Sequence, residues 1–470
     1  MVTLTRAAAC FFLVLTLMLS GCSFEQHSPI DGKEASNQSQ SGSSATAGNQ
    51  EQAAPPFSNE GPATDHSAGG SGEDLGQTES GKLPTTGSGD AAPSDNLGGS
   101  GNESPGAPPP DEPAAPPTDA TWVAVGDVMM HMPQLPAYYN DKTKQYDFSP
   151  YFDAVRPLIR EGDWSLANLE TPIAGQSLGY SGFPRFNAPT ELAEALREAG
   201  FSIVTNANNH SLDRGAEGIS RTLAALEAQQ LVTKGTNRSR FEAEKLTIVE
   251  KKGIRMGLLA YTYGTNGIAL PAAMPYAVDI VDEQKMLGDI AKLKEAGADF
   301  ITVALHFGTE YQTVPSEAQK KLARKLVAAG ADIIAGAHPH VVQPYETVEV
   351  TEVDGTIRNG LIIYSMGNFI SNQRGGTKDY GLLMKVGIRK DNVTGQTTIR
   401  DVEPIPTWVY RYKVGKLNHY RIVPLDETIA KRTIPELSSA EYAALTRGKQ
   451  TIDQRLASMS AAPVTVPAAP

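Results

Sequence analysis

Residues 121 to about 343 alternate between short apolar runs and segments with helical spacing, and this alternation constrains the fold more than any other feature. The runs at 122–126 and 201–205 have the length and composition of buried strands. The segment 190–200 has helical spacing and ends in a helix-stopping glycine. Beyond Gln343 the chain is rich in strand-forming residues. Alternating strands and helices followed by a run of strands predict an α/β fold with mixed sheets.

Residues 23–117 have a composition that cannot form a packed core. They include 15 Gly, 15 Ser, 13 Pro and 12 Ala, so 55 of 95 positions are small or helix-breaking. With few apolar side chains to offset the entropy lost on ordering, we predict a disordered tether. Its 14 acidic residues and two lysines account for the whole net charge of −12. The rest of the chain is nearly neutral, which excludes the strong basic field of a nucleic-acid-binding protein.

The first 22 residues have the pattern of a bacterial lipoprotein signal peptide. The apolar run 7–20 follows Arg6 and is shorter than a membrane span, but it has the length of a signal-peptide core. It ends in Leu-Ser-Gly-Cys22, which resembles a lipobox, so we expect a lipid on Cys22. An ordinary secretory signal or an uncleaved anchor is the alternative. The pattern predicts a protein held by lipid on the outer face of the cell membrane.

These segments divide the chain into four parts. We expect a signal peptide at 1–22, a tether at 23–117, one folded domain at 118–445, and the end of a helix with an Ala/Pro tail at 446–470. A domain of about 330 residues can bury a sufficient core without disulfides.

Polar side chains follow several predicted strands, and ligands bind at the carboxyl ends of strands in open α/β sheets. Both cysteines lie within 1–22, so a metal in the folded part has only His, Asp, Glu or Asn as ligands. Such ligands suit Zn, Mn, Fe or Mg. Each residue alone is readily explained as a turn, cap or core residue, but together they predict one pocket. They are Asp127, Asn168, Glu170, Asn206, Asn208, Asn209, His210, His306, His338 and His340.

Six short motifs occur in order between about 121 and 371. They are Gly126-Asp127-Val-Met-Met, Asn168-Leu-Glu170-Thr-Pro, Asn208-Asn209-His210-Ser-Leu-Asp213-Arg-Gly215, His306-Phe-Gly308-Thr-Glu310-Tyr311, Gly336-Ala-His338-Pro339-His340-Val-Val-Gln343 and Tyr364-Ser-Met-Gly367-Asn368-Phe369. Together they resemble the motifs of the CapA family of capsule synthesis proteins, also called PgsA. The resemblance implies a metallophosphatase-like fold, a double-sheet α/β/β/α sandwich, and a role in producing poly-γ-glutamate.

The resemblance also implies roles for single residues. The positions that match metal ligands are Asp127, Glu170 (as a bridging carboxylate), Asn209, His306, His338 and His340. His210 matches a histidine that protonates a leaving group, so we expect catalysis to depend on His210 and Asp127. Arg185 resembles part of a further family motif, where a guanidinium holds a carboxylate or phosphate, or forms a loop salt bridge. The other candidate substrate-binding residues are Asn168, Glu310 and Tyr311.

The first motif departs from the family pattern. Phosphoesterases of this fold usually have Asp-x-His, whereas Met129 stands two residues after Asp127. A thioether is a poor ligand for a hard or borderline cation, so one metal loses a ligand unless His131 replaces it. The bridging position is Glu170 instead of the usual aspartate. These departures favour one metal or a remodelled site over a full two-metal phosphoesterase site.

These features predict a lipid-anchored, extracytoplasmic protein of poly-γ-glutamate production. The expected ligand is the anionic polymer, and the expected partners are membrane synthase subunits. As an enzyme, it would carry out metal-assisted hydrolysis of a phosphoester or an amide, with His210 as general acid. The alternatives are a non-catalytic binding or assembly subunit and an extracellular metallophosphoesterase.

Overall fold

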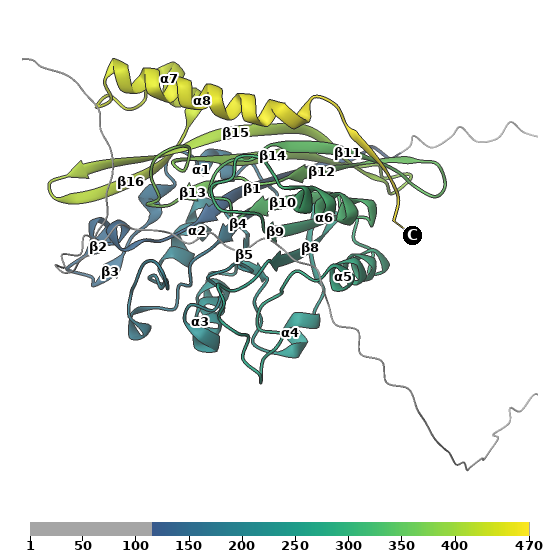
Figure 1. Ribbon diagram of the computed structural model, residues 1–470, viewed down its shortest axis with the longest axis horizontal. Helices are drawn as coiled ribbons and strands as arrows, with labels where there is room; N and C mark the ends of the chain where they lie inside the picture. Colours follow the sequence, from purple (N-terminus) through teal and green to yellow (C-terminus); the bar gives the residue numbers. More distant parts are fainter. Residues whose placement is uncertain (1–114, 470) are drawn as a thin grey trace, which may run out of the picture. The chain divides into compact units, whose positions relative to one another are not determined.

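The structure is a computed structural model, and it describes residues 115–469. The expected signal peptide at 1–22, the lipid site at Cys22 and all but the last three residues of the tether at 23–117 lie outside the described residues. Figure 1 shows the arrangement of strands and helices in the folded part.

The first large sheet is mixed and contains the first strand of the fold near its centre. Its strands β1, β4, β5 and β6 are parallel, whereas β14, β15 and β16 form an antiparallel half. In spatial order the strands are β16 (Leu417–Pro424), β15 (Thr397–Val414), β14 (Tyr380–Lys390), β1 (Thr118–Val128), β4 (Trp164–Leu169), β5 (Ile203–Thr205) and β6 (Val232–Lys234), with β13 (Asn368–Ile370) also paired to β1.

The second large sheet has a parallel centre and antiparallel neighbours. Its strands β8, β9, β10 and β12 are parallel, and β7 and β8 form a hairpin that turns at Lys252-Gly253. In spatial order the strands are β17 (Val464–Pro467), β11 (Tyr345–Thr351), β12 (Ile357–Ile363), β10 (Ile333–Ala337), β9 (Phe300–His306), β8 (Ile254–Thr262) and β7 (Thr247–Lys251). A separate small hairpin pairs β2 (Tyr139–Asn140) with β3 (Gln145–Tyr146).

Helices cover the outer faces of both sheets. Those of the described residues are α1 (Arg156–Ile159), α2 (Leu192–Ala199), α3 (Gly215–Ala228), α4 (Arg240–Glu244), α5 (Glu283–Glu295), α6 (Glu317–Ala328), α7 (Leu425–Lys431) and α8 (Ser439–Ser460), with short 3-10 turns at Met132–Gln134, Pro136–Tyr138, Ser149–Tyr151 and Gln176–Leu178. α1, α2 and α3 pack on the first sheet, and α5 and α6 pack on the second. None of these helices combines the length and the hydrophobicity that crossing a membrane requires.

The two sheets face each other across an apolar core, because alternate residues of each strand point to opposite faces. In β1, Trp122 and Ala124 enter the core between the sheets, where they belong to the same cluster as Met256 of the second sheet. Val123 and Val125 point the other way, into the core beneath the helices. The predicted double-sheet α/β/β/α sandwich is therefore confirmed.

The C-terminal segment differs from the expectation of a helix end and a tail at 446–470. Helix α8 crosses the expected boundary at 445, and Ile452 and Leu456 on one of its faces are buried in the core between the sheets. β17 then pairs in parallel with β11, Val464 opposite Val348. The edge of β11 offers unpaired backbone groups, which explains why the Ala/Pro-rich end forms a strand. The folded part thus extends past 445, and α8, along the top of Figure 1, packs on β11.

We expect Ile452→Ala to destabilise the whole folded part. The side chain of Ile452 is fully buried between the sheets, so its truncation should lower the free energy of unfolding by about 2–5 kcal/mol. The control is Gln454→Ala on the exposed side of the same helix, which should change the free energy of unfolding by less than about 0.5 kcal/mol. Urea denaturation of the full chain measures both. Equal stability of the two variants would show that α8 is not part of the core.

Candidate metal site

Asp127 lies at the carboxyl end of β1, where the chain passes close to the loop before β13. Its backbone N–H donates to the carbonyl of Gly367 at 2.9 Å. A Cβ at Gly126 would lie 1.9 Å from the same carbonyl oxygen, so only glycine permits this approach. The contact places the fully buried Asp127 carboxylate at the end of the sandwich where the parallel strands of both sheets finish.

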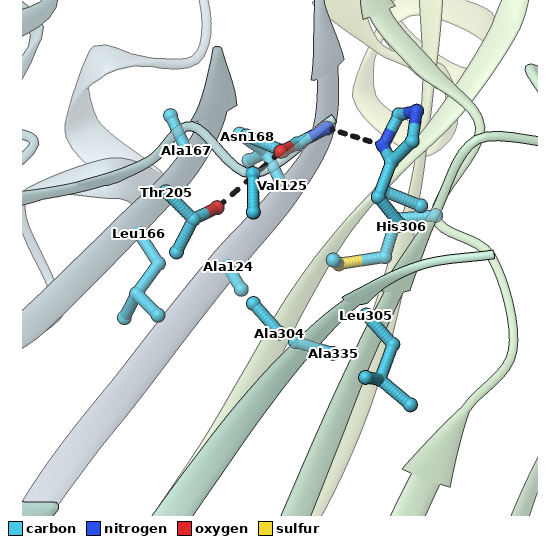
Figure 2. A pocket seen from close by; sticks show the side chains of 13 residues that line it. Ala124, Val125, Leu166, Ala167, Asn168, Thr205, Ala304, Leu305, His306 and Ala335 are labelled. Atoms are coloured by element: carbon cyan, nitrogen blue, oxygen red, sulfur yellow. Dashed lines mark hydrogen bonds between the residues drawn. The ribbon is translucent and has the colours of Figure 1, made fainter. Parts of the chain in front are cut away.

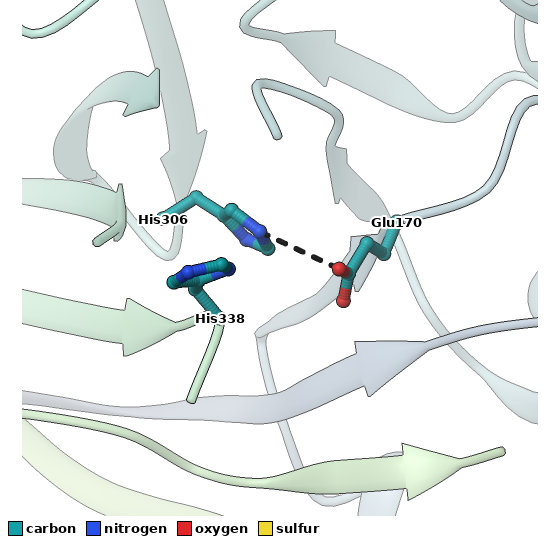
Figure 3. Close-up of side chains that lie close together, drawn as sticks. All are labelled: Glu170, His306 and His338. Carbon is teal, nitrogen blue, oxygen red and sulfur yellow. Dashed lines mark ion pairs between the residues drawn. The ribbon is translucent and has the colours of Figure 1, made fainter. Parts of the chain in front are cut away.

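Glu170 follows β4 and lies among histidines of the second sheet. Its Oε1 is 3.5 Å from Nε2 of His306 and 3.6 Å from Nε2 of His340. Figure 3 shows the ring of His306 directed at this carboxylate, with the ring of His338 beside it. The carboxylate is fully buried, and neither of its oxygens has a hydrogen-bond partner.

His338 and His340 follow β10 in a turn with left-handed backbone. Their φ angles are 100° and 58°, which non-glycine residues seldom adopt outside functional sites. Nδ1 of His340 is 3.0 Å from Oδ2 of Asp127. Both ring nitrogens of the buried His338 lack a hydrogen-bond partner. The turn therefore directs two imidazoles toward the carboxylates of the first sheet.

Three overlapping groups among the described residues can each hold a metal ion. They are Glu170 with His306 and His338, Asp127 with Glu170 and His340, and Glu310 with His338 and His340, and within each group the donor atoms lie within 4.8 Å of one another. Glu170 belongs to two of the groups, which is the arrangement of a carboxylate between two ions. Buried polar atoms without partners carry a desolvation cost that a cation would remove. The unpartnered atoms of Glu170 and His338 therefore fit a divalent metal.

Charge interactions within the site shift the pKa values of its members in different directions. Burial alone lowers the pKa of His340, but Glu170 and Asp127 raise it to about 10. Burial alone raises the pKa of Glu170, but the charges of His340 and His306 hold it below its usual value. Burial, and then the neighbouring His306 and His340, hold the pKa of His338 well below its usual value. His338 is thus neutral and has a lone pair available for a cation.

Two asparagines hold the ring of His306 between them. Nδ2 of Asn168 is 3.3 Å from Nδ1 of the ring, and Oδ1 of Asn209 is 2.9 Å from Nε2. The same Asn168 amide donates to Oδ1 of Asp127 at 2.8 Å. Asn168 was expected to bind substrate, but these bonds occupy its amide nitrogen. Its position is that of a residue that orients two metal-compatible side chains.

A small cavity of about 10 Å³ lies between the sheets beneath these residues (Figure 2). In it Thr205 donates to Oδ1 of Asn168 at 3.4 Å, and the rest of the lining is largely apolar. This volume holds roughly one water molecule at most. The cavity is therefore no substrate pocket, and a substrate must reach the site from the carboxyl ends of the strands.

His210 lies beside the metal-compatible groups and is oriented by a carboxylate. Its Nδ1 is 2.8 Å from Oδ2 of Asp213, and the same oxygen accepts the backbone N–H of Phe186 at 2.7 Å. The ring of Phe186 meets the His210 ring edge-on at 4.7 Å. Among the described residues, Nε2 of His210 makes no hydrogen bond. Nδ1 thus faces the protein, and Nε2 is left for another molecule.

The remaining candidates lie at the border of the site. Arg185 is exposed, and its side chain forms no hydrogen bond or ion pair with another described residue. Glu310 is half-buried and belongs to the third metal-compatible group. The ring of Tyr311 is 6.0 Å from that of His340. Asn208 donates to the carbonyl of Leu169 at 2.8 Å, and Oδ1 of Asn206 accepts the backbone N–H of Thr236 at 3.0 Å, so both asparagines connect this loop to neighbouring segments.

Met129 is buried, and His131 is held by its own loop. Nδ1 of His131 is 3.2 Å from Oε1 of Gln134 and accepts the backbone N–H of Asn372 at 3.3 Å. His131 belongs to none of the three metal-compatible groups. The charges of His340, Glu170 and His210 still act on it, so it lies next to the site without joining the clustered donors.

Sequence reasoning missed two residues that follow β8. The ring of Tyr263 is 4.6 Å from that of His338, and Oδ1 of Asn266 accepts from Nδ2 of Asn209 at 3.1 Å. Both follow the carboxyl end of a parallel strand, so the rule that located the other candidates also applies here. Neither belongs to a quoted motif, which explains why they were overlooked.

The fold and these contacts define an α/β sandwich protein with a candidate divalent-metal centre at the carboxyl ends of its strands. The sequence profile of the family described as bacterial capsule synthesis protein PGA_cap matches residues 121–373. The match covers more than half of the chain and every member of the metal-compatible groups. The chain belongs to this family.

Two curated relatives are similar over most of their own length. The PGA biosynthesis protein CapA of Bacillus subtilis (strain 168) is 29% identical over 321 residues, which cover 62% of this chain and 80% of that protein. The capsule biosynthesis protein CapA of Bacillus anthracis is 29% identical over 296 residues, which cover 61% of this chain and 67% of that protein.

Solved structures with some likeness include proteins whose titles describe a nucleotidase and a phosphoesterase. The NAD nucleotidase NadN of Haemophilus influenzae has a TM-score of 0.40 and 14% identity, covering 72% of this chain and 61% of that chain. The calcineurin-like phosphoesterase YfkN of Bacillus subtilis has a TM-score of 0.36 and 17% identity, covering 72% and 98%. At these TM-scores the likeness carries no argument about activity or substrate.

We expect His338→Phe to abolish metal binding while leaving the metal-free fold at least as stable. The phenyl ring keeps the volume but removes two buried nitrogens without partners, each of which costs about 1–3 kcal/mol. Metal affinity should fall more than about 100-fold, since even residues that only orient a ligand are worth 10–100-fold. Calorimetric titration of the metal-free chain with Mn²⁺ or Zn²⁺ measures this, and His419→Phe, away from the site, is the matched control. Unchanged affinity in His338→Phe would exclude His338 as a ligand.

We expect the stability of the metal-free protein to depend on His131 below neutral pH. Removal of the ring from water lowers the pKa of His131 from 6.5 to about 4. Between these two pH values the unfolded chain binds more protons than the folded chain. The contribution of the neutral His131 ring to the free energy of unfolding is therefore complete above about pH 6.5 and is lost as the pH falls toward 4. Asn at 131 keeps an acceptor for the Asn372 N–H but does not titrate. In denaturation experiments with a metal chelator present, His131→Asn should therefore gain stability relative to wild type as the pH falls from 6.5 to 4. A difference in the free energy of unfolding that does not change with pH would contradict this.

Proposed function

We propose that this protein is a metal-dependent hydrolase that acts in poly-γ-glutamate capsule production. The observation that carries the proposal is the set of unpartnered, fully buried donor atoms of Glu170 and His338 among further carboxylate and imidazole ligands. A protein with a purely structural role gains nothing from burying donors that bond to no other group. Pre-arranged donors at the open ends of strands suit a bound ion that meets a substrate.

The residues that would hold the metal come from both sheets. They are Asp127, Glu170, Asn209, His306, His338 and His340. A set of nitrogen and oxygen donors suits Mn, Zn, Fe or Mg. A bound divalent cation supplies a Lewis acid and lowers the pKa of a coordinated water, which prepares that water as a nucleophile.

His210 is suited to deliver the proton that the leaving group requires. Its contact with Asp213 orients the ring so that Nδ1 faces the carboxylate and Nε2 faces away from it. The doubly protonated ring can donate from Nε2. In hydrolysis the water oxygen forms a bond to phosphorus or to the carbonyl carbon and releases a proton to solvent, while the bond to the leaving group breaks. His210 donates its Nε2 proton to that group and afterwards regains one from solvent.

The polymer and the cellular setting come from the relatives and the sequence. The relatives named for PGA and capsule biosynthesis support poly-γ-glutamate as the material on which the protein acts. The exposed guanidinium of Arg185 is available to a carboxylate of such a polymer. The lipobox at Cys22 and the long tether support attachment to the outer face of the cell membrane, next to membrane synthase subunits.

We expect His210→Ala to lower kcat by about 10²–10⁴-fold without loss of bound metal, because it removes the proton donor alone. Purified full-length protein loaded with Mn²⁺ would be assayed on poly-γ-glutamate and on an aryl phosphate, which identifies the bond that is cleaved. His338→Phe should lose metal and turnover together, and His419→Phe should keep both. A wild-type protein that binds metal but cleaves neither substrate would overturn the hydrolase and leave a binding or assembly subunit.

A further inference from the structure

The loop between β13 and β14, residues 371–379, borders the metal site and is here called the rim loop. The backbone N–H of Asn372 donates to Nδ1 of His131 at 3.3 Å, and Nε2 of Gln373 donates to the hydroxyl of Tyr311 at 3.4 Å. Asn368, which pairs with Asp127 across β1 and β13, donates to the carbonyl of Lys378 at 3.1 Å. The rim loop thus contacts three residues at or beside the site.

The C-terminal helix holds the rim loop in place. Nη1 of Arg455 on α8 donates to Oγ1 of Thr377 at 3.2 Å and to the carbonyl of Val342 at 2.9 Å. Val342 follows the turn that carries His338 and His340, so one guanidinium connects that segment with the rim loop. The bonds from Arg455 therefore help to fix the position of Lys378, the residue after Thr377, from outside the loop.

Most cations near the rim loop are bound to acceptors of the protein. Arg374 donates to Asp379 at 3.1 Å and to the carbonyl of Val409 at 3.0 Å, and Arg411 donates to Asn372 at 3.5 Å. Lys378 differs. Among the described residues, its Nζ has no hydrogen bond and no ion pair, and it lies 4.6 Å from the centre of the Tyr311 ring.

Tyr311 connects this free ammonium group to the metal site. Its backbone N–H donates to the carbonyl of Pro339, between the two histidines of the turn, at 2.8 Å. Its ring lies 6.0 Å from that of His340 and beneath the ammonium of Lys378. A cation over an aromatic face is held in position but keeps its hydrogen-bond donors. Lys378 is therefore a positioned donor for an anion next to the site.

We infer that Lys378 binds one carboxylate of the polymer while the adjacent bond of the polymer lies at the metal site. This inference rests on the proposed function. A second unpaired cation, Arg185, lies on a different loop, next to Phe186, whose ring contacts those of His131 and His210. Lys378 thus lies over Tyr311, which is beside His340, and Arg185 precedes Phe186, which contacts His210. A polymer with a carboxylate in every repeat meets both cations with separate groups, which a small monoanion cannot do. Lys378 is a specificity-determining residue for a polyanionic chain.

The test is the affinity of the full chain for fluorescently labelled poly-γ-glutamate, measured by anisotropy at fixed salt. Lys378→Met keeps the aliphatic stem over Tyr311 and removes the charge, and it should weaken binding about tenfold, the value of one hydrogen bond to a charged group. Lys378→Arg should restore most of the affinity. Lys251→Met is the matched control, since this exposed lysine is the last residue of β7 and pairs with Ile254, the first residue of β8, at the end of the sheet away from His306.

The possible results separate the inference from the function on which it rests. Weaker binding in Lys378→Met, a smaller salt dependence and normal binding in Lys251→Met support the inference. Equal affinities of wild type and Lys378→Met would overturn it and leave the proposed function intact. A wild-type protein that does not bind the polymer would overturn both. Equal losses in Lys378→Met and Lys251→Met would show only non-specific attraction and would also overturn the assignment of Lys378.

Discussion

The packing of one sheet against the other is the constraint on which the rest of the structure depends. Each sheet provides part of the candidate site: Asp127 and Glu170 lie at or just after the ends of strands of the first, and His306, His338 and His340 at or just after the ends of strands of the second. The apolar residues between the sheets, with Trp122 among the largest, bring the two sets of strand ends together. Stability and site geometry thus come from the same interface.

The interface has an electrostatic consequence at its polar end. Two carboxylates and three imidazoles are buried within contact distance of one another, and the protein compensates them only in part. His340 is paired with Asp127, whereas Glu170 and His338 have no hydrogen-bond partner. Buried ionisable groups without partners are costly, and such an arrangement is characteristic of metal and catalytic sites.

The C-terminal helix links the stability of the sandwich to the border of the site. One face of α8 contributes Ile452 to the core between the sheets, and Arg455 on the same helix bonds to both the rim loop and the segment after His340. The match to the family profile ends at residue 373, before most of the rim loop and all of α8. These later elements position groups around a site whose metal-compatible residues all lie within the family match.

The alternation of strands and helices and the choice of Asp127, Glu170, His306, His338 and His340 as site candidates came from the sequence, and the double-sheet sandwich came from the family resemblance of its motifs. Periodicity identifies strands, and polar residues after strands indicate a site. Only the tertiary structure decided that Asn168 orients its neighbours, that Tyr263 and Asn266 join the site, and that 464–467 forms a strand. The reason is physical: a residue's type and its place on a strand are local, whereas its contacts depend on which distant strand the core packs against it.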